Sequence, residues 1–353
     1  MGDSDKPLRS GWTTGACATA SVKAAAQALL GQGFPDPVTI VLPRGETVAF
    51  PLALQEQGDG WARAGVVKDA GDDPDVTHGA TIISTLRRGQ PGSGVVFKAG
   101  EGVGIVTKPG LPLPVGEPAI NPVPRQMMLQ QVQGMTDLEI EIAVPGGEQI
   151  AQKTWNPRLG ILGGLSILGT TGVVVPYSCS AWIHSIQSGI DVARATHITH
   201  VAGCTGNTSE NAAKALYGLG DDAIIDMGDF VGGMLKYLRD HPIARVTIAG
   251  GFAKLSKLAT GAMDLHSKRS QVDKDWLAAR LGDLGADPAL VIQAQAANTA
   301  LEILELATAA SLPIADSVAS ECTKVCRDVL RDAPISLDVL VFDRKGGLVG
   351  QSK

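Results

Sequence analysis

The chain has 353 residues and a formal net charge of −6 at pH 7, with 44% hydrophobic and 19% charged residues. This length favours two domains, each large enough to bury a core of its own. The acidic balance argues against nucleic acid as a partner, and no apolar run is long enough to span a membrane. The N-terminus lacks the apolar region of a secretory signal, and the five scattered cysteines suit reduced thiols. We therefore expect a cytoplasmic protein.

The first half of the chain mixes predicted helices and strands. A helix is predicted over 18–30, with Thr14 as its cap and with Gly31 and Gly33 at its end. Residues 137–144 alternate strictly between apolar and polar side chains, which predicts a half-buried antiparallel strand. Further strands are predicted over 38–42, 47–54, 62–67 and 95–99.

The densest group of charges lies in residues 68–75, which contain four acidic side chains. Hard metal ions prefer carboxylate oxygens, so a cation site is one interpretation. The spacing does not fit an EF-hand, however, and aspartates beside glycine and proline also form ordinary capped turns. The sequence leaves both interpretations open and favours the turn.

A helix predicted over 177–194 marks the boundary between the domains, and the pattern changes after it. Strands over 197–202, 223–225, 244–249 and 337–342 are interleaved with helices over 209–217 and 230–240 and a mostly helical stretch over 273–332. Alternation of strands and helices predicts a parallel sheet with crossover helices. Ligands of open α/β sheets bind beyond the carboxyl ends of the strands. We therefore expect a ligand site at that edge of the second sheet.

The clearest candidate for this site follows the strand over 197–202. The glycine-containing turn over 203–208 leads directly into a helix, for which Thr208 or Ser209 is the expected cap. A strand, a glycine turn and a helix N-terminus can hold the polar groups of a nucleotide-like ligand. Asp226 lies twenty positions beyond Gly206, a distance at which an acid commonly holds ribose hydroxyls. The turn does not match G-x-G-x-x-G, so an ordinary strand-to-helix turn remains the alternative.

The third strand adds a second glycine turn, because it ends in Gly250 and Gly251 and a helix with Lys254 and Lys257 follows. The two glycine turns and Asp226 would then share one edge of the sheet. This convergence supports a site more strongly than any single motif.

Other constellations give no support for metal or serine chemistry. Cys322 and Cys326 have no third cysteine nearby, which excludes the usual zinc and iron–sulfur patterns. Ser178 does not lie in a G-x-S-x-G motif. We expect no metal site.

Seven segments in the same order resemble one family, the CbiD family of cobalt-precorrin-5B (C-1)-methyltransferases in cobalamin biosynthesis. They are RSGWTTGACATA at 9–20, KDAGDDPDVTHGA at 68–80, GEGVGIVTKPGL at 100–111, GEPAINPVPR at 116–125, TWNPRLGILGGLSILGTTGVV at 154–174, GNTSE at 206–210 and GGFAKLSKLATG at 250–261. One position departs from the family's pattern: Gly251 stands where we expect a histidine in many relatives. The pattern returns at His266 and Ser267.

The resemblance implies a fold of two domains. Residues 1–190 would form an α+β domain of a permuted ribosomal-S5-domain-2-like type, and residues 191–353 a small α/β domain with a parallel sheet. The implied reaction moves the methyl group of S-adenosylmethionine to C-1 of cobalt-precorrin-5B, giving cobalt-precorrin-6A. The sequence leaves the oligomeric state open, a homo-oligomer included.

The resemblance and the two glycine turns together give the expected site residues. The residues expected to bind S-adenosylmethionine are Gly203, Thr205, Gly206, Asn207, Thr208, Asp226, Gly250 and Gly251. The residues expected to meet the carboxylate-rich corrin precursor are Thr13, Thr14, Arg125, Thr170, Thr171, Lys254, Lys257 and His266. His266 and Asp226 are the candidate catalytic residues. Two other functions remain alternatives: a nicotinamide-dependent reductase of a corrin precursor and a non-catalytic tetrapyrrole carrier.

Overall fold

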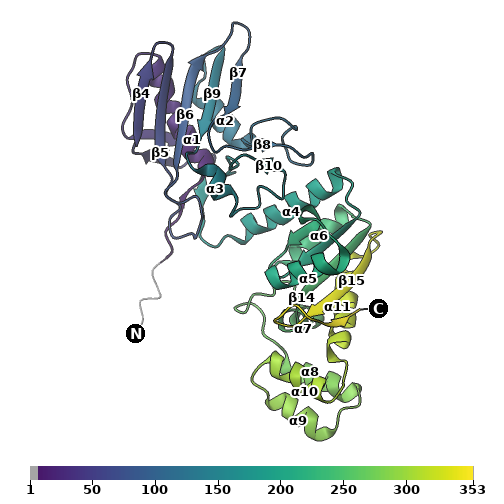
Figure 1. Ribbon diagram of the computed structural model, residues 1–353. Helices are drawn as coiled ribbons and strands as arrows, with labels where there is room; N and C mark the ends of the chain where they lie inside the picture. The colour runs from purple at the N-terminus through teal and green to yellow at the C-terminus, as the bar shows by residue number, and fades with distance from the viewer. Residues whose placement is uncertain (1–6, 353) are drawn as a thin grey trace. The chain divides into compact units, whose positions relative to one another are not determined.

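The computed structural model describes residues 7–352, which form two compact units with their boundary after Cys179 (Figure 1). Sequence analysis places the domain boundary at residue 190, which lies inside helix α4 (Cys179–Ala195). Both units mix helices with strands, so the fold is of the mixed α/β kind. No helix within residues 7–352 is long and apolar enough to cross a membrane.

The N-terminal unit contains a five-stranded sheet in the order β4-β5-β6-β9-β7. Its strands are β4 (Leu54–Gly58), β5 (Trp61–Val67), β6 (Thr81–Arg88), β9 (Leu138–Ala143) and β7 (Val95–Ala99). All neighbours are antiparallel except β7, which pairs with β9 in parallel. Leu138, Ile140 and Ile142 of β9 are buried and the residues between them are half-buried, as the alternation predicts.

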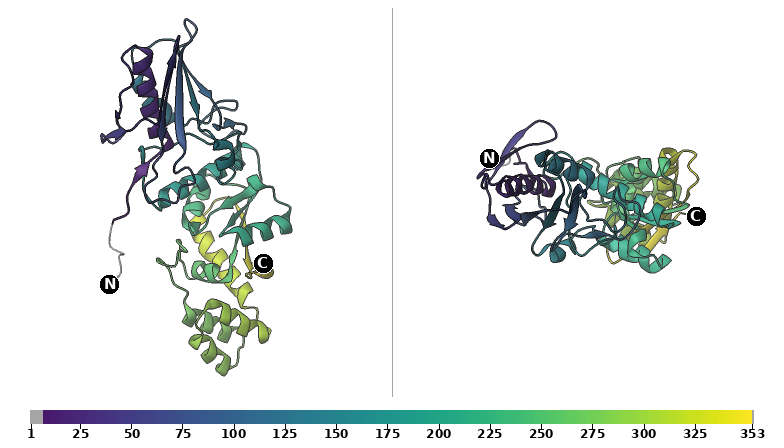
Figure 2. Two further views of the ribbon diagram at one scale, coloured as in Figure 1. Left: turned by 60° about the vertical axis from the view of Figure 1, so that its left-hand side comes forward. Right: turned by 90° about the horizontal axis from the view of Figure 1, so that it is seen from above.

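Helix α1 (Thr14–Leu29) packs on β5 and β6 and against helix α2 (Pro122–Gln131), along one face of this sheet (Figure 2). The prediction that Thr14 caps the helix is wrong. The N-cap is Thr13, whose hydroxyl accepts a hydrogen bond from the backbone N–H of Ala16 at 3.2 Å. The Thr14 hydroxyl is instead bound by the backbone of Leu168, so the helix starts earlier than its alanine run suggests.

Shorter elements complete the N-terminal unit. They are the hairpin of β2 (Val38–Val41) and β3 (Thr47–Phe50), the antiparallel pairs β1 (Gly11–Trp12) with β11 (Val173–Val174) and β8 (Ile105–Val106) with β10 (Ile161–Leu162), and helix α3 (Gly147–Ala151). The pairing of β1 with β11 joins segments from the two ends of the unit.

The acidic segment over 68–75 forms a turn held by ion pairs. Arg9 pairs with Asp69 through its guanidinium and with Asp72 through its backbone N–H. Lys68, only 1% exposed, donates to Asp75 at 2.7 Å. Within residues 7–352 no group of three His, Cys, Asp or Glu side chains could hold a metal ion. The carboxylates therefore serve the turn in this structure.

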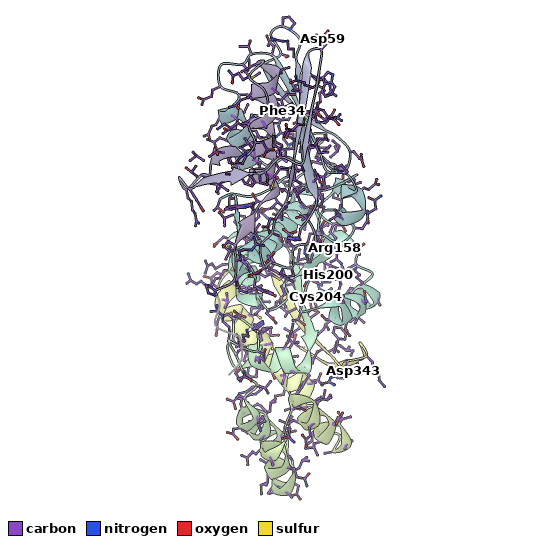
Figure 3. All side chains as sticks on the ribbon, turned by 90° about the vertical axis from the view of Figure 1, so that its left-hand side faces the viewer. Phe34, Asp59, Arg158, His200, Cys204 and Asp343 are labelled. Atoms are coloured by element: carbon purple, nitrogen blue, oxygen red, sulfur yellow. The ribbon has the colours of Figure 1, made fainter. Side chains whose placement is uncertain are left out.

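The C-terminal unit is built on a five-stranded sheet in the order β13-β12-β14-β15-β16. Its strands are β12 (His200–Cys204), β13 (Ile224–Asp226), β14 (Arg245–Gly251), β15 (Ser336–Phe342) and β16 (Leu348–Gln351). The first four strands of this order are parallel, as the strand–helix alternation predicts, and β16 is an antiparallel edge strand. Figure 3 labels His200 and Cys204, the two ends of β12.

Helices cover both faces of this sheet. Helix α5 (Asn207–Tyr217) packs on one face, over a small cluster that includes Ala202, Cys204 and Ala249. The other face carries the larger core, to which α4, α6 (Val231–Asp240), α7 (Phe252–Ala259) and α11 (Ile314–Leu330) contribute. The other helices of this unit are α8 (Lys274–Asp283), α9 (Pro288–Ala296) and α10 (Ala300–Ala309), and Asp221–Ala223 form a 3-10 turn.

A polar network lies toward the N-terminal ends of the parallel strands. The Nε2 atom of His200 lies 2.8 Å from the hydroxyl of Thr247, which donates to Asp338. Asp338 also accepts from Arg245 at 3.2 Å and from the Tyr217 hydroxyl at 2.7 Å, and the Tyr217 ring stands edge-on to His200. Burial and the charge of Arg245 lower the pKa of His200, against a smaller opposing effect of Asp338.

Lys68→Met should destabilise the N-terminal unit by about 2 kcal/mol. Breaking a fully buried pair costs about 3–5 kcal/mol, and Asp75 is part-exposed, which reduces the loss. Burial raises the pKa of Asp75, but Lys68 and Thr77 together hold it below its usual value. This stabilisation is present above about pH 4 and is lost as the pH falls through the lowered pKa, so the variant should also be less acid-sensitive.

Thermal unfolding across pH checks this prediction. Arg87→Gln is the control, because Arg87 pairs with glutamates at the protein surface and its loss should cost less than about 1 kcal/mol. Equal stability of the two variants would contradict the account of Lys68.

His200→Gln should flatten the pH dependence of stability between about pH 5.5 and about pH 7.5. Because the folded state lowers the pKa of His200, the unfolded chain binds a proton first, near pH 6.5, and stability falls below that pH. Glutamine can still bond Thr247 but does not titrate. Melting temperatures at the two pH values check this, with His184→Gln, at an exposed position, as a control that should behave as wild type.

Candidate active-site pocket

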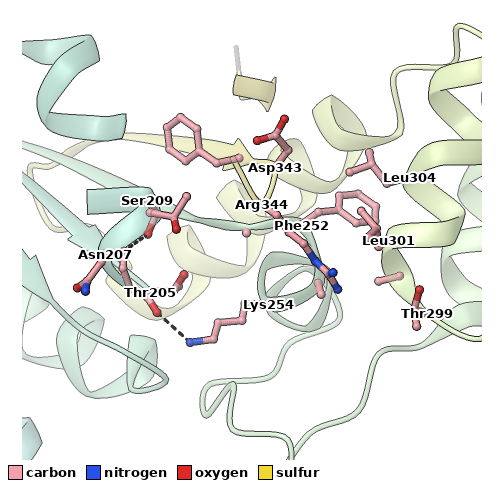
Figure 4. A pocket seen from close by; sticks show the side chains of 16 residues that line it. Thr205, Asn207, Ser209, Phe252, Lys254, Thr299, Leu301, Leu304, Asp343 and Arg344 are labelled. Atoms are coloured by element: carbon pink, nitrogen blue, oxygen red, sulfur yellow. Dashed lines mark hydrogen bonds between the residues drawn. The ribbon is translucent and has the colours of Figure 1, made fainter. Parts of the chain in front are cut away.

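A pocket of about 720 Å³ lies at the carboxyl ends of β12, β14 and β15 (Figure 4). Its lining residues are 205–209, 251–254, 299–301 with Leu304, and 342–344. They come from the β12–α5 turn, the start of α7, the start of α10 and the β15–β16 turn. The pocket therefore lies at the edge of the sheet where sequence analysis expects a ligand.

The register of the parallel strands brings these segments together. Cys204 pairs with Ala249, and Gly251 pairs with Phe342, so the three strands end at nearly the same level. Helix α5 begins directly after Gly206, and α7 directly after Gly251. Neither glycine has a side chain that could cap its helix, so the first backbone N–H groups of both helices are available at the pocket.

Lys254, on helix α7, joins this helix to two loops beside the pocket. Its ammonium group donates to the carbonyl oxygen of Thr205 at 2.8 Å (dashed in Figure 4) and lies 3.0 Å from Oδ1 of Asp229, in the β13–α6 loop. That oxygen is buried and has no hydrogen-bond partner within residues 7–352, so the ion pair is its main compensation. The positive charge of Lys254 is thus largely neutralised by the protein.

Apolar side chains form the rest of the wall. Phe252 begins α7, Phe342 ends β15, and Leu301 and Leu304 come from α10. Thr299, also at the wall, caps α10 by accepting from the backbone N–H of Glu302. A large pocket with one apolar side and one side of backbone amides suits a ligand with a flat apolar part and polar groups.

Five of the residues expected to bind the methyl donor line this pocket: Thr205, Gly206, Asn207, Thr208 and Gly251. Gly203 and Gly250 are not among the lining residues, and both glycines are needed for packing. A Cβ at Gly203 would lie 2.4 Å from the sulfur of Met234, and one at Gly250 would lie 2.9 Å from the Thr205 side chain.

The expected cap of α5 is wrong, because the helix begins at Asn207 and its N-cap is Gly206. The Ser209 hydroxyl donates to the Gly206 carbonyl oxygen from within the first turn. Asp226 ends the outer strand β13 and is not among the lining residues. Its Oδ1 accepts from the backbone N–H of Gly228 at 3.2 Å. A role of Asp226 toward ribose hydroxyls stays a prediction.

Lys257 and His266 also lie outside the pocket lining. Lys257 is buried and donates to the carbonyl oxygen of Leu265 at 2.8 Å, so it holds the α7–α8 loop in place. His266 is exposed, and its Nδ1 accepts from the backbone N–H of Lys268. Their predicted substrate contacts and the catalytic role of His266 stay predictions.

The threonine loops of the N-terminal unit do lie side by side. Thr13 donates its backbone N–H to Gly172, and its side chain fills the space where a Cβ on Gly169 would lie. Thr170 is exposed beside them, and the Thr171 hydroxyl bonds the backbone of Val173. The structure thus brings the predicted Thr13–Thr14 and Thr170–Thr171 loops together.

Arg125, by contrast, is occupied within its own unit. It donates to the carbonyl oxygens of Ile120 and Pro118 and to the carboxylate of Glu117, and its guanidinium lies over the ring of Phe97. These contacts give Arg125 a structural role in the loop before α2. Substrate binding by Arg125 stays a prediction.

Three buried cysteines have weakly reactive thiols. Burial raises the pKa of Cys17 and that of Cys326 to about 12, and burial also raises the pKa of Cys322. At neutral pH these thiols are protonated and weakly nucleophilic.

Sequence reasoning missed the side chains that α10 and the β15–β16 turn contribute to the pocket. Arg344 lies just after the last parallel strand. Because ligands of such sheets bind beyond the carboxyl ends of the strands, the sequence offered a signal for Arg344. Leu301 and Leu304 gave no such signal, because nothing in the sequence says where a helix far along the chain will pack.

Comparisons with known proteins cover nearly the whole chain. The family model described as CbiD matches residues 1–176, and the model described as CbiD, C-terminal domain, matches residues 264–353. A protein of Paramagnetospirillum magneticum named cobalt-precorrin-5B C(1)-methyltransferase is 68% identical over 99% of both chains. Proteins of the same name from Rhodospirillum rubrum and Brucella anthropi are 66% and 60% identical, over 99% and 98% of this chain and 98% and 95% of theirs.

One solved structure is also similar: the 1.9 Å crystal structure of a cobalamin biosynthesis protein (cbiD) from Archaeoglobus fulgidus. It is 28% identical with a TM-score of 0.39, over 74% of this chain and 83% of that one. The relatives with 60–68% identity and the match over residues 1–176 decide the matter: the chain belongs to the CbiD family.

Proposed function

We propose that this chain transfers a methyl group from S-adenosylmethionine to C-1 of cobalt-precorrin-5B, giving cobalt-precorrin-6A. The names of the relatives with 60–68% identity support the reaction and the substrate. The observation that carries the proposal for this chain is the pocket of about 720 Å³ where β12, β14 and β15 end together.

The pocket fits the chemistry of the methyl donor. Phe252, Leu301 and Leu304 offer an apolar surface for a purine, while Asn207 and the free amides of α5 and α7 offer partners for polar groups. S-Adenosylmethionine supplies a methyl group already activated on a sulfonium. The protein then needs neither a covalent nucleophile nor a metal ion of its own, and alignment of the two reactants supplies most of the rate.

The residues of the chain receive distinct roles in this proposal. Thr205, Gly206, Asn207, Thr208 and Gly251 hold the donor at the strand ends. Lys254 positions the turn over 205–209 by holding the Thr205 carbonyl oxygen. The paired threonine loops of the N-terminal unit offer hydroxyls to the corrin precursor.

The fold types of the two domains, the location of the protein and its partners belong to the same proposal. The N-terminal domain, residues 1–190, is of the permuted ribosomal-S5-domain-2-like type, and residues 191–353 bind the donor. The protein acts in the cytoplasm on a small-molecule corrin precursor, without nucleic acid or membrane partners. These statements rest on the family resemblance and the composition.

Two measurements separate this function from its alternatives. Isothermal titration should show binding of S-adenosylhomocysteine and none of NADPH, whereas a reductase would bind NADPH. Mass spectrometry of a reaction with S-adenosylmethionine and the corrin precursor should then show a singly methylated product. A carrier would bind the pigment tightly and leave it unmethylated.

Ala253→Trp should weaken donor binding without unfolding the protein. Ala253 is exposed, is the second residue of α7 and lines the pocket, so an indole there would fill ligand space. Overpacking costs about 1–3 kcal/mol, which lowers affinity for S-adenosylhomocysteine by about fivefold to 150-fold. The matched control is Ala289→Trp, at the exposed second position of α9 and outside the pocket. Equal binding by both variants would place the donor elsewhere.

A further inference from the structure

Arg344 is the pocket's uncompensated positive charge. Lys254, the other cation of the lining, already faces Asp229 and the carbonyl oxygen of Thr205. Arg344 is exposed, and within residues 7–352 no hydrogen bond or ion pair joins its guanidinium to another residue. A guanidinium left free at a cavity wall is available to a ligand, and its planar donors match a carboxylate.

The backbone that carries Arg344 is well fixed. Oδ1 of Asp343 accepts from the N–H groups of Lys345 and Gly347, each at 2.8 Å, and the Asp343 N–H donates to the Gly347 carbonyl oxygen. Asp343 thus closes the β15–β16 turn rather than pairing with its neighbour. In Figure 4 the Asp343 and Arg344 side chains leave the turn in different directions, and Arg344 lies among the lining side chains.

The surroundings of Arg344 select for a carboxylate that belongs to a large ligand. The first turns of α5 and α7 border the same pocket without side-chain caps, so they add N–H donors for negative charge. The pocket volume of about 720 Å³ is larger than a small free anion needs, and such an anion would have no use for the apolar wall of Leu301 and Leu304.

We propose that Arg344 is a specificity-determining residue that binds a carboxylate of the ligand in this pocket. The inference rests on the proposed function and deepens it. Two reactants carry such a group: the amino-acid end of S-adenosylmethionine and the acidic side chains of the corrin precursor. The same guanidinium chemistry recognises either one.

Titration calorimetry with paired probes tests the proposal and separates the two sources. S-Adenosylhomocysteine is compared with 5′-methylthioadenosine, which lacks the amino-acid carboxylate. Cobyrinic acid is compared with its methyl ester, in which the carboxylates are blocked. Each probe is titrated into the wild-type full chain and into Arg344→Gln, Arg344→Lys and Lys345→Gln. The last variant removes one positive charge from the same turn at a residue outside the pocket lining.

Arg344→Gln should lower the affinity for one carboxylated probe by about tenfold to a hundredfold and leave its carboxylate-free partner unchanged. Arg344→Lys should recover part of the loss, because it restores the charge without the planar fork, and Lys345→Gln should match wild type. A loss with S-adenosylhomocysteine assigns the donor carboxylate, and a loss with cobyrinic acid assigns the substrate.

Three results would overturn the inference. If wild type binds the probes and Arg344→Gln binds them equally well, Arg344 has no such role while the proposed function stands. If Lys345→Gln weakens binding as much as Arg344→Gln, the effect is one of general charge. If wild type binds no probe at all, the proposed function fails and this inference fails with it.

Discussion

The C-terminal unit depends on the register of its parallel strands. Cys204 pairs with Ala249 and Gly251 pairs with Phe342, so three strands end at almost one level. The segment that follows each strand therefore begins at the same edge of the sheet. A shift of one residue in any strand would turn its buried side chains to the opposite face. The hydrophobic cores on the two faces therefore fix the register of the strands, and the register fixes the geometry of the pocket.

The pocket combines this rigid edge with parts that arrive from elsewhere. The strand ends supply backbone donors and small residues, which set where polar groups can bind. Helix α10 supplies Leu301 and Leu304, and the β15–β16 turn supplies Arg344, so the apolar wall and the free charge come from the last third of the chain. Recognition of the flat and the charged parts of a ligand is thus divided between different elements.

Sequence reasoning recovered what depends on local pattern. The alternation over 137–144 gave β9, and the strand–helix alternation gave the parallel sheet and hence the edge at which the pocket lies. It failed where tertiary contacts decide. The hydroxyl of Thr14 is drawn to Leu168, far along the chain, so Thr13 becomes the cap. Gly203 also gives room to the side chain of Met234, and no pattern in the sequence could reveal that neighbour. A contact of Gly203 with the donor stays a prediction.

The ammonium of Lys254 joins the turn after β12, the loop after β13 and the start of α7. If one of these segments moves away, a buried carboxylate oxygen of Asp229 or the Thr205 carbonyl loses its partner, which is costly in a low-dielectric setting. The three segments are therefore energetically coupled, and they should open together as one cooperative unit rather than fray one at a time. A ligand that orders any one of them also orders the other two.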